Sequence, residues 1–162
     1  MYRANGEGSS WEALASGNQT KTDGARIKWR RPTLNLLEAV MSVRTVASKF
    51  VELCRQGKNF DVMRTMYAPN IFSVEGDGKE TAGQGPVIKK SEDWVSDKTF
   101  NGETVAGPFF NGGNPDQFAV YFTLDVTPKA TGKRITLEEV AVYTVNKDDK
   151  ITREQFFYEG EH

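Results

Sequence analysis

Apolar residues recur every three or four positions over residues 34–56, which is the period of an amphipathic helix. The apolar stripe consists of Leu37, Val40, Met41, Val46, Phe50, Leu53 and Cys54. Gly57 is a suitable stop, because glycine readily adopts the left-handed conformation that ends many helices. A second, shorter helix is predicted over residues 59–67, with Asn59 as its cap, since Pro69 cannot continue a helix.

The pattern then changes twice along the chain. Residues 71–74 read as a short strand that ends in a Gly-rich turn, and Gly85-Pro86 opens a third predicted helix over residues 87–95. Beyond it, four predicted strands rich in Val, Thr, Phe and Tyr cover residues 99–105, 117–127, 133–145 and 150–158. Helices followed by long strands predict an α+β fold, with a curved antiparallel sheet folded over about three helices.

Residues 146–149 supply the turn between the last two strands. Closing a hairpin there pairs Val145 with Lys150 and places alternate residues on one surface. That surface holds Leu137, Glu139, Ala141, Tyr143, Glu154, Phe156 and Tyr158. In this register the Cβ atoms of Glu139 and Glu154 are diagonal neighbours about 7 Å apart. On a concave surface the two carboxyls suit acid-base chemistry, whereas at an open sheet end they are ordinary exposed acids.

The opposite surface of the hairpin is also apolar. It carries Val140, Val142, Ile151 and Phe157, which are too apolar to face water alone. We expect a homodimer contact there, with a covering loop or the N-terminal segment as the alternative.

The composition of the chain excludes several classes of function. The chain has 21 Lys and Arg against 22 Asp and Glu, so its net charge of −1 gives no bulk attraction to nucleic acid or an anionic membrane. No stretch approaches the ~20 apolar residues that span a bilayer. The lone Cys54 cannot form an internal disulfide, and we expect a cytoplasmic protein. Because the only histidine is His162, neither a histidine triad nor a metal site is expected.

Two parts of the chain are predicted. Residues 1–33 are rich in Gly, Ser, Asn and charge, which predicts a disordered tail, and residues 34–162 form the domain. Within the tail, the basic and aromatic run 26–31 is short, so a solvated flank is favoured over a nucleic-acid contact.

Several segments resemble a known family. The runs 50–53, 66–75, 139–145 and 156–158 are similar to SnoaL-like domains of the nuclear-transport-factor-2-like superfamily, over residues 36–158. The resemblance implies a cone-shaped, cystatin-like topology with a cavity for a small hydrophobic molecule, and frequent homodimers. Members include isomerases, cyclases, dehydratases and non-catalytic binding proteins, so the fold does not choose the chemistry.

Ketosteroid isomerases of this superfamily have catalytic residues that this sequence matches only in part. The general-base position falls at Glu75, but the two oxyanion-hole positions fall at Phe50 and Ala141, which cannot donate hydrogen bonds. Since one such donor is commonly worth about 10²–10³ in rate, the sequence argues against steroid isomerisation by that mechanism.

Two functional hypotheses remain. The first is a cofactor-free enzyme acting on a small apolar molecule, with Glu75 as base and Glu139 or Glu154 as acid. The second is a non-catalytic ligand-binding or dimeric interaction domain. In both, the predicted pocket is lined by Phe50, Tyr67, Phe72, Trp94, Phe118, Phe122, Tyr143, Phe156 and Tyr158. These aromatic side chains would otherwise simply fill a closed core.

Overall fold

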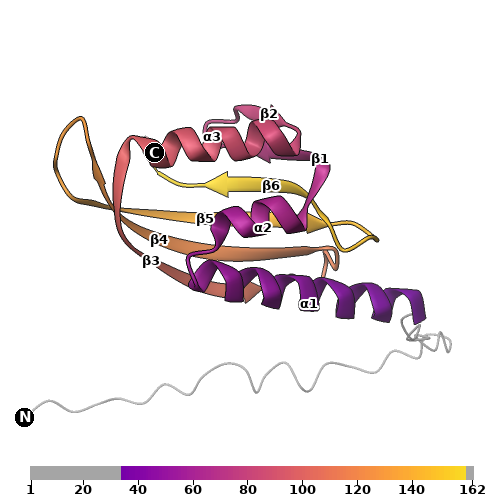
Figure 1. Ribbon diagram of the computed structural model, residues 1–162. Helices are drawn as coiled ribbons and strands as arrows, with labels where there is room; N and C mark the ends of the chain where they lie inside the picture. The colour runs from indigo at the N-terminus through magenta and orange to yellow at the C-terminus, as the bar shows by residue number, and fades with distance from the viewer. Residues whose placement is uncertain (1–33, 160–162) are drawn as a thin grey trace, which may run out of the picture. The chain divides into compact units, whose positions relative to one another are not determined.

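The computed structural model describes residues 34–159, with side chains from residue 42 onward. The predicted tail over residues 1–33 lies outside the described residues. The chain forms α1 (Leu34–Arg55), α2 (Asn59–Met66), β1 (Tyr67–Val74), β2 (Glu80–Ala82), α3 (Gln84–Ser96), β3 (Lys98–Phe109), β4 (Gln117–Pro128), β5 (Ile135–Val145) and β6 (Ile151–Phe157) (Figure 1).

Helix α1 buries one stripe over residues 42–55, and the predicted stripe residues Leu37, Val40 and Met41 lie outside the described side chains. The buried residues of that part are Val43, Val46, Ala47, Phe50, Val51 and Cys54, which are spaced by three and one in alternation. That spacing places them on a single helix face, as the sequence predicts. The helix ends at Arg55, and Gly57 follows in the left-handed region with a φ of 69°. Its amide donates to the Cys54 carbonyl at 2.8 Å, which confirms the predicted stop.

The end of α2 differs from the prediction. Tyr67 is extended, with φ −77° and ψ 143°, and begins β1 instead of ending the helix. The side-chain nitrogen Nε2 of Gln84 donates to the carbonyls of Met63 (2.9 Å) and Tyr67 (3.3 Å), so α3 supplies a partner for the last turn of α2. The predicted capping role of Asn59 is also wrong: it is the first helical residue, and its side chain bonds to Glu103.

The six strands form one sheet in the order β2-β1-β6-β5-β4-β3. Neighbouring strands are antiparallel except β1 and β6, which run parallel. Helix α3 contacts β1 and β2 at one edge and β3 at the other, while α1 contacts β3 and β4. Since one helix reaches both edges, the sheet is strongly curved around the helices, which confirms the predicted α+β class (Figure 1).

The last hairpin has a different register from the predicted one. Oδ1 of Asn146 accepts hydrogen bonds from the amides of Asp148 and Lys150, so the loop extends to residue 150 and Val145 pairs with Ile151. A further one-residue irregularity follows, and Tyr143 pairs with Glu154. Because the total slip is two residues, the side chains beyond the irregularity keep their predicted faces.

Two details of that hairpin are corrected. Ile151 precedes the irregularity and is fully buried in the core, so its predicted place on the outer surface is wrong. Glu139 and Glu154 are not diagonal neighbours, because Glu154 lies opposite Tyr143, four positions along the strand from Glu139.

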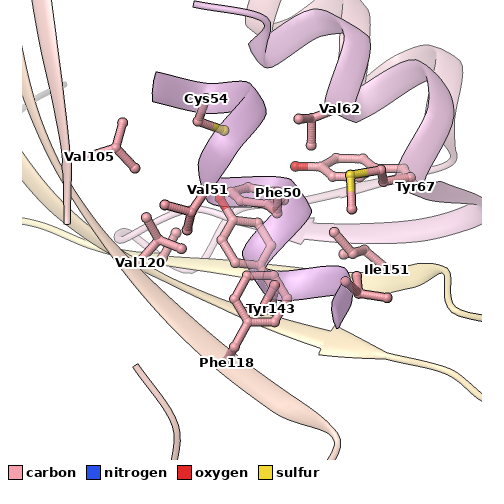
Figure 2. Close-up of a cluster of buried hydrophobic side chains, with 14 of the residues drawn as sticks. Phe50, Val51, Cys54, Val62, Tyr67, Val105, Phe118, Val120, Tyr143 and Ile151 are labelled. Atoms are coloured by element: carbon pink, nitrogen blue, oxygen red, sulfur yellow. The ribbon is translucent and has the colours of Figure 1, made fainter. Parts of the chain in front are cut away.

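Three aromatic rings form the centre of the core. Phe50 of α1 lies 5.4 Å from Phe118 of β4 and 4.4 Å from Tyr143 of β5, measured between ring centroids. The Phe118 and Tyr143 rings stack at 5.1 Å. Figure 2 shows this group beside α1. These contacts pack α1 against the inner face of β4 and β5.

Candidate functional site

A cavity of about 390 Å³ lies between the helices and the sheet. This volume falls in the range of about 300–1,000 Å³ that is typical of ligand pockets. Its charged lining residues are Glu75, Asp77, Lys79, Lys90, Glu103, Glu139 and Glu154. Its apolar and aromatic lining residues include Phe50, Phe60, Met63, Tyr67, Trp94, Phe100, Phe122, Leu124, Tyr143, Phe156 and Tyr158.

Most of the residues predicted for the site come together here. The cavity wall contains Glu75, Glu139, Glu154, Phe50, Tyr67, Trp94, Phe122, Tyr143, Phe156 and Tyr158. Two predicted lining residues lie elsewhere. Phe72 points away from the helices and is 45% exposed, because it alternates along β1 with the buried Ile71 and Ser73. Phe118 is buried in the core against Phe50 and Tyr143 and does not line the cavity.

Glu154 is the most deeply buried charged residue of the site, with 1% of its surface exposed. The Tyr67 hydroxyl donates a hydrogen bond to its Oε2 atom. Among residues 42–159, its Oε1 atom has no hydrogen-bond partner. Burial raises the pKa of Glu154, while the hydroxyls of Tyr67 and Ser73 and the charge of Lys90 oppose that rise. One carboxylate oxygen is thus free to accept a hydrogen bond from a ligand.

Glu139 lies on β5, opposite Phe122 of β4. Burial raises its pKa to about 7, and the negative charges of Glu75, Glu154 and Glu103 add to that rise, whereas Lys90 opposes it. Near neutral pH both the ionised and the protonated form of this carboxyl are therefore populated.

Glu75 is held by two neighbours from different elements. Lys90 of α3 forms an ion pair with its Oε1 atom and also donates to the Ser73 hydroxyl at 2.6 Å. The Tyr158 hydroxyl donates to Oε2 of Glu75 at 3.2 Å. Both carboxylate oxygens of Glu75 are thus engaged within the protein.

Asn59 and Glu103 form a second polar group in the cavity lining. Asn59 donates from its amide nitrogen to both oxygens of Glu103, at 3.1 and 3.0 Å. Burial raises the pKa of Glu103, and the bond from Asn59 opposes that effect. The nearby Cys54 thiol is buried, and its pKa is raised to about 12 by burial and by the Glu103 charge. Cys54 is therefore a packing residue and not a nucleophile.

Sequence reasoning missed several polar residues of the site, among them Lys90, Asn59 and Glu103. Lys90 had a usable signal, because it precedes Trp94 by four positions in a predicted helix and so shares its face. The sequence gives no such signal for Glu103, because apolar and polar residues alternate only weakly along β3 and most of its residues are at least partly exposed.

Neither a membrane span nor a metal centre is found in the described range. No helix of residues 34–159 is long and apolar enough to cross a membrane. Over the same range, no three His, Cys, Asp or Glu side chains gather as the ligands of a metal ion would.

The curved sheet wrapped on three helices is an α+β fold that is shared with a nuclear-transport-factor-2-like protein from Cytophaga hutchinsonii. That protein is 14% identical, with a TM-score of 0.54, over 71% of this chain and 97% of that one. The chain belongs to the SnoaL-like domain family, whose model matches residues 41–158. No curated protein matches it significantly.

Solved structures agree with this assignment. A candidate SnoaL-like polyketide cyclase from Mesorhizobium loti is 39% identical, with a TM-score of 0.66, over 72% of this chain and 98% of that one. A candidate polyketide cyclase from Xanthomonas campestris is 14% identical, with a TM-score of 0.57, over 75% and 93% of the two chains. A Mycobacterium tuberculosis protein in complex with estradiol-17beta-hemisuccinate is 18% identical, with a TM-score of 0.57, over 72% and 94%.

Proposed function

We propose that the cavity binds a small molecule with a mostly apolar body, and that Glu139 and Glu154 move protons to and from that molecule without a cofactor. The observation that carries this proposal is the free Oε1 atom of Glu154, a buried acceptor in a largely aromatic cavity with no partner among residues 42–159. A buried carboxylate oxygen without a partner is unfavourable, so a bound molecule that pairs with it gains affinity.

Glu139 is the better proton-transfer group. Its pKa of about 7 lets it accept a proton and return it near neutral pH. Glu154, oriented by Tyr67, provides the second carboxyl. Both oxygens of Glu75 are engaged by Lys90 and Tyr158, so we assign Glu75 a positioning role instead of the base role that the sequence suggests.

The reaction class follows from this arrangement. One carboxyl that removes a proton and another that supplies one suit an isomerisation, a cyclisation or a dehydration. The cyclase description of the Mesorhizobium loti relative supports this reading. The complex of the Mycobacterium tuberculosis protein with estradiol-17beta-hemisuccinate supports only the binding of a small molecule.

The first experiment is native mass spectrometry of protein purified from cells, followed by a crystal structure of any complex. We expect a co-purified small molecule that contacts Glu139 or Glu154. Once a reaction is identified, Glu139→Gln and Glu154→Gln should each reduce turnover by at least about 100-fold, the usual worth of general acid-base catalysis. Glu138→Gln is the matched control, because Glu138 is exposed on the other face of the same strand. Full activity of both cavity variants would contradict the catalytic assignment.

An interaction role through the outer sheet face is the second candidate. Phe72 and Phe157 are 45% and 50% exposed there, and Val140 lies opposite Phe157 on β5. Exposed apolar side chains on one sheet face favour association with another protein surface. We propose a homodimer formed through this face. We also propose a cytoplasmic location, which the single free and buried Cys54 suits.

A further inference from the structure

We propose that the ligand of this cavity is an organic ammonium ion, a molecule with an apolar body and one protonated amine that is held among the cavity's carboxylates. The inference rests on the proposed function, because it names the class of molecule that the same cavity binds.

The charges of the cavity wall favour a cation. Five lining residues carry a carboxyl group and two carry an amine, so acids outnumber bases by three. The inner amine, Lys90, is already paired with Glu75 and bonded to Ser73. The other amine, Lys79, is exposed to solvent, so an anionic ligand inside the cavity would meet mainly carboxylates and be repelled, whereas a cation would be attracted.

The hydrogen-bonding groups of the cavity wall also favour a cationic ligand. In the described part of the chain, the two buried side-chain atoms that lack a partner are Oε1 of Glu154 and Oδ1 of Asn59, and both line the cavity. The orientation of the Asn59 amide is fixed, because its nitrogen donates to Glu103. Oδ1 of Asn59 is therefore an acceptor, and so is Oε1 of Glu154 when that carboxyl is ionised. An ammonium group brings three donors and no acceptor, which is the complement of this wall.

The aromatic side chains are compatible with such a ligand. Two cavity rings already face an ammonium group of the protein: Lys90 Nζ lies 5.4 Å from the Phe156 ring centroid, and Lys98 Nζ lies 4.3 Å from that of Trp94. Aromatic faces attract cations through their quadrupole, most strongly where water is excluded. The same rings provide apolar surface for the body of the ligand.

Proton release gives the proposal a measurable signature. Burial raises the pKa of Glu139 to about 7; the facing carboxylates of Glu75, Glu154 and Glu103 add to that rise, and Lys90 opposes it. A bound ammonium ion lowers the pKa of these carboxyls in the same way as Lys90 does. Binding should therefore release protons, and affinity for the cation should rise as the pH increases from 6 to 8.

The test compares three probes that differ only at one end: 2-phenylethylammonium, neutral 2-phenylethanol and anionic 3-phenylpropanoate. Isothermal titration calorimetry on the full chain, in two buffers of different ionisation enthalpy, measures affinity and proton release together. We expect the ammonium probe to bind at least about tenfold tighter than the alcohol, with the carboxylate weakest.

Paired variants locate the site. Glu139→Gln and Glu154→Gln should each reduce the preference for the ammonium probe by about tenfold, whereas Glu138→Gln should leave it unchanged. Lys90→Met should strengthen ammonium binding, because it removes a competing cation from the cavity. Lys89→Met should not, since Lys89 pairs with Asp93 on the exposed side of α3. Circular dichroism checks that each variant is folded.

The outcomes separate this inference from the proposed function. If the alcohol binds as tightly as the ammonium probe, or the cavity variants keep the full preference, the cation assignment is wrong while ligand binding stands. If no probe binds and no small molecule is found in the purified protein, both proposals are wrong.

Discussion

The hydroxyl of Tyr67, at the start of β1, donates a hydrogen bond to Oε2 of Glu154 in β6, a residue 87 positions later. Both side chains are buried, with 4% and 1% of their surface exposed. A tyrosine hydroxyl has one hydrogen to donate. The bond therefore satisfies one oxygen of the buried carboxyl, fixes its orientation and leaves the other oxygen for a ligand.

Replacing Tyr67 by Phe should destabilise the protein by about 1–3 kcal/mol, because a second oxygen of a buried carboxyl then loses its partner. The pKa of Glu154 should also rise, since the Tyr67 bond lowers it in the wild type. Urea denaturation measures the first effect. Tyr121→Phe is the control, and it should cost clearly less, because Tyr121 is only partly buried and removing its hydroxyl leaves no buried carboxyl without a partner. Equal stability of all three proteins would contradict the structural role.

The stability of the fold should depend on Glu139 in a defined pH window. Its pKa is raised from 4.5 to about 7, so the folded state binds more protons than the unfolded state between these values. Stability should therefore fall as the pH rises through this window, by about 3 kcal/mol at most. Thermal melts from pH 4.5 to 8 should show a flatter profile for Glu139→Gln, and this variant should be the more stable protein at pH 8. Glu138→Gln should follow the wild-type profile.

Lys90 should control the protonation of the cavity. Its positive charge lowers the pKa of both Glu139 and Glu154. In Lys90→Met we expect the pKa of Glu139 to rise above about 7, which carboxyl carbon NMR titration can follow. Lys89→Met tests whether any lysine of α3 has this effect. If the pKa of Glu139 is identical in the wild type and in Lys90→Met, the charge of Lys90 does not act on Glu139 and this prediction is wrong.

Periodicity accounts for what the sequence could predict. The helix spacing around Phe50 and the alternation of β4 identify buried faces directly, because an element's period determines which side chains face the core. The same logic assigned Glu154 and Glu139 to the inner face. It succeeded in spite of a wrong register, because the error was an even number of residues.

The errors have local causes that no period encodes. The side-chain oxygen of Asn146 lengthened the last turn, so Ile151 pairs with Val145 and faces the core; the irregularity that follows restored the predicted faces of the later residues. Phe72 was assigned to the pocket for being aromatic, although its neighbours Ile71 and Ser73 occupy the inner face. Contacts such as that between Lys90 and Glu75 join separate elements, so they follow from tertiary packing alone.

The aromatic group in the core should dominate stability. Phe118 is 1% exposed and contacts both Phe50 and Tyr143, so Phe118→Ala should cost about 3–5 kcal/mol. Phe109→Ala removes the same ring from a position that is 54% exposed, and its cost should be far smaller. Chemical denaturation of the two variants side by side measures the difference. Similar losses would mean that the core is centred elsewhere.

The outer face of the sheet leads to a prediction about assembly. Phe157, Val140 and Tyr121 line a shallow depression on that face, and Phe157 is 50% exposed. We expect the wild-type chain, of 18.1 kDa, to sediment at about twice that mass in analytical ultracentrifugation. Phe157→Glu should give a monomer, because a charge at the centre of an apolar contact must be desolvated without a partner.

The control for this effect is Phe109→Glu, which introduces the same charge at an equally exposed phenylalanine on β3. It should leave the mass at that of the wild type. If Phe109→Glu gives the monomer and Phe157→Glu does not, the contact lies at the β3 edge of the sheet. If the wild type is itself monomeric across micromolar concentrations, the homodimer proposal is wrong, while the proposal of ligand binding in the cavity is unaffected.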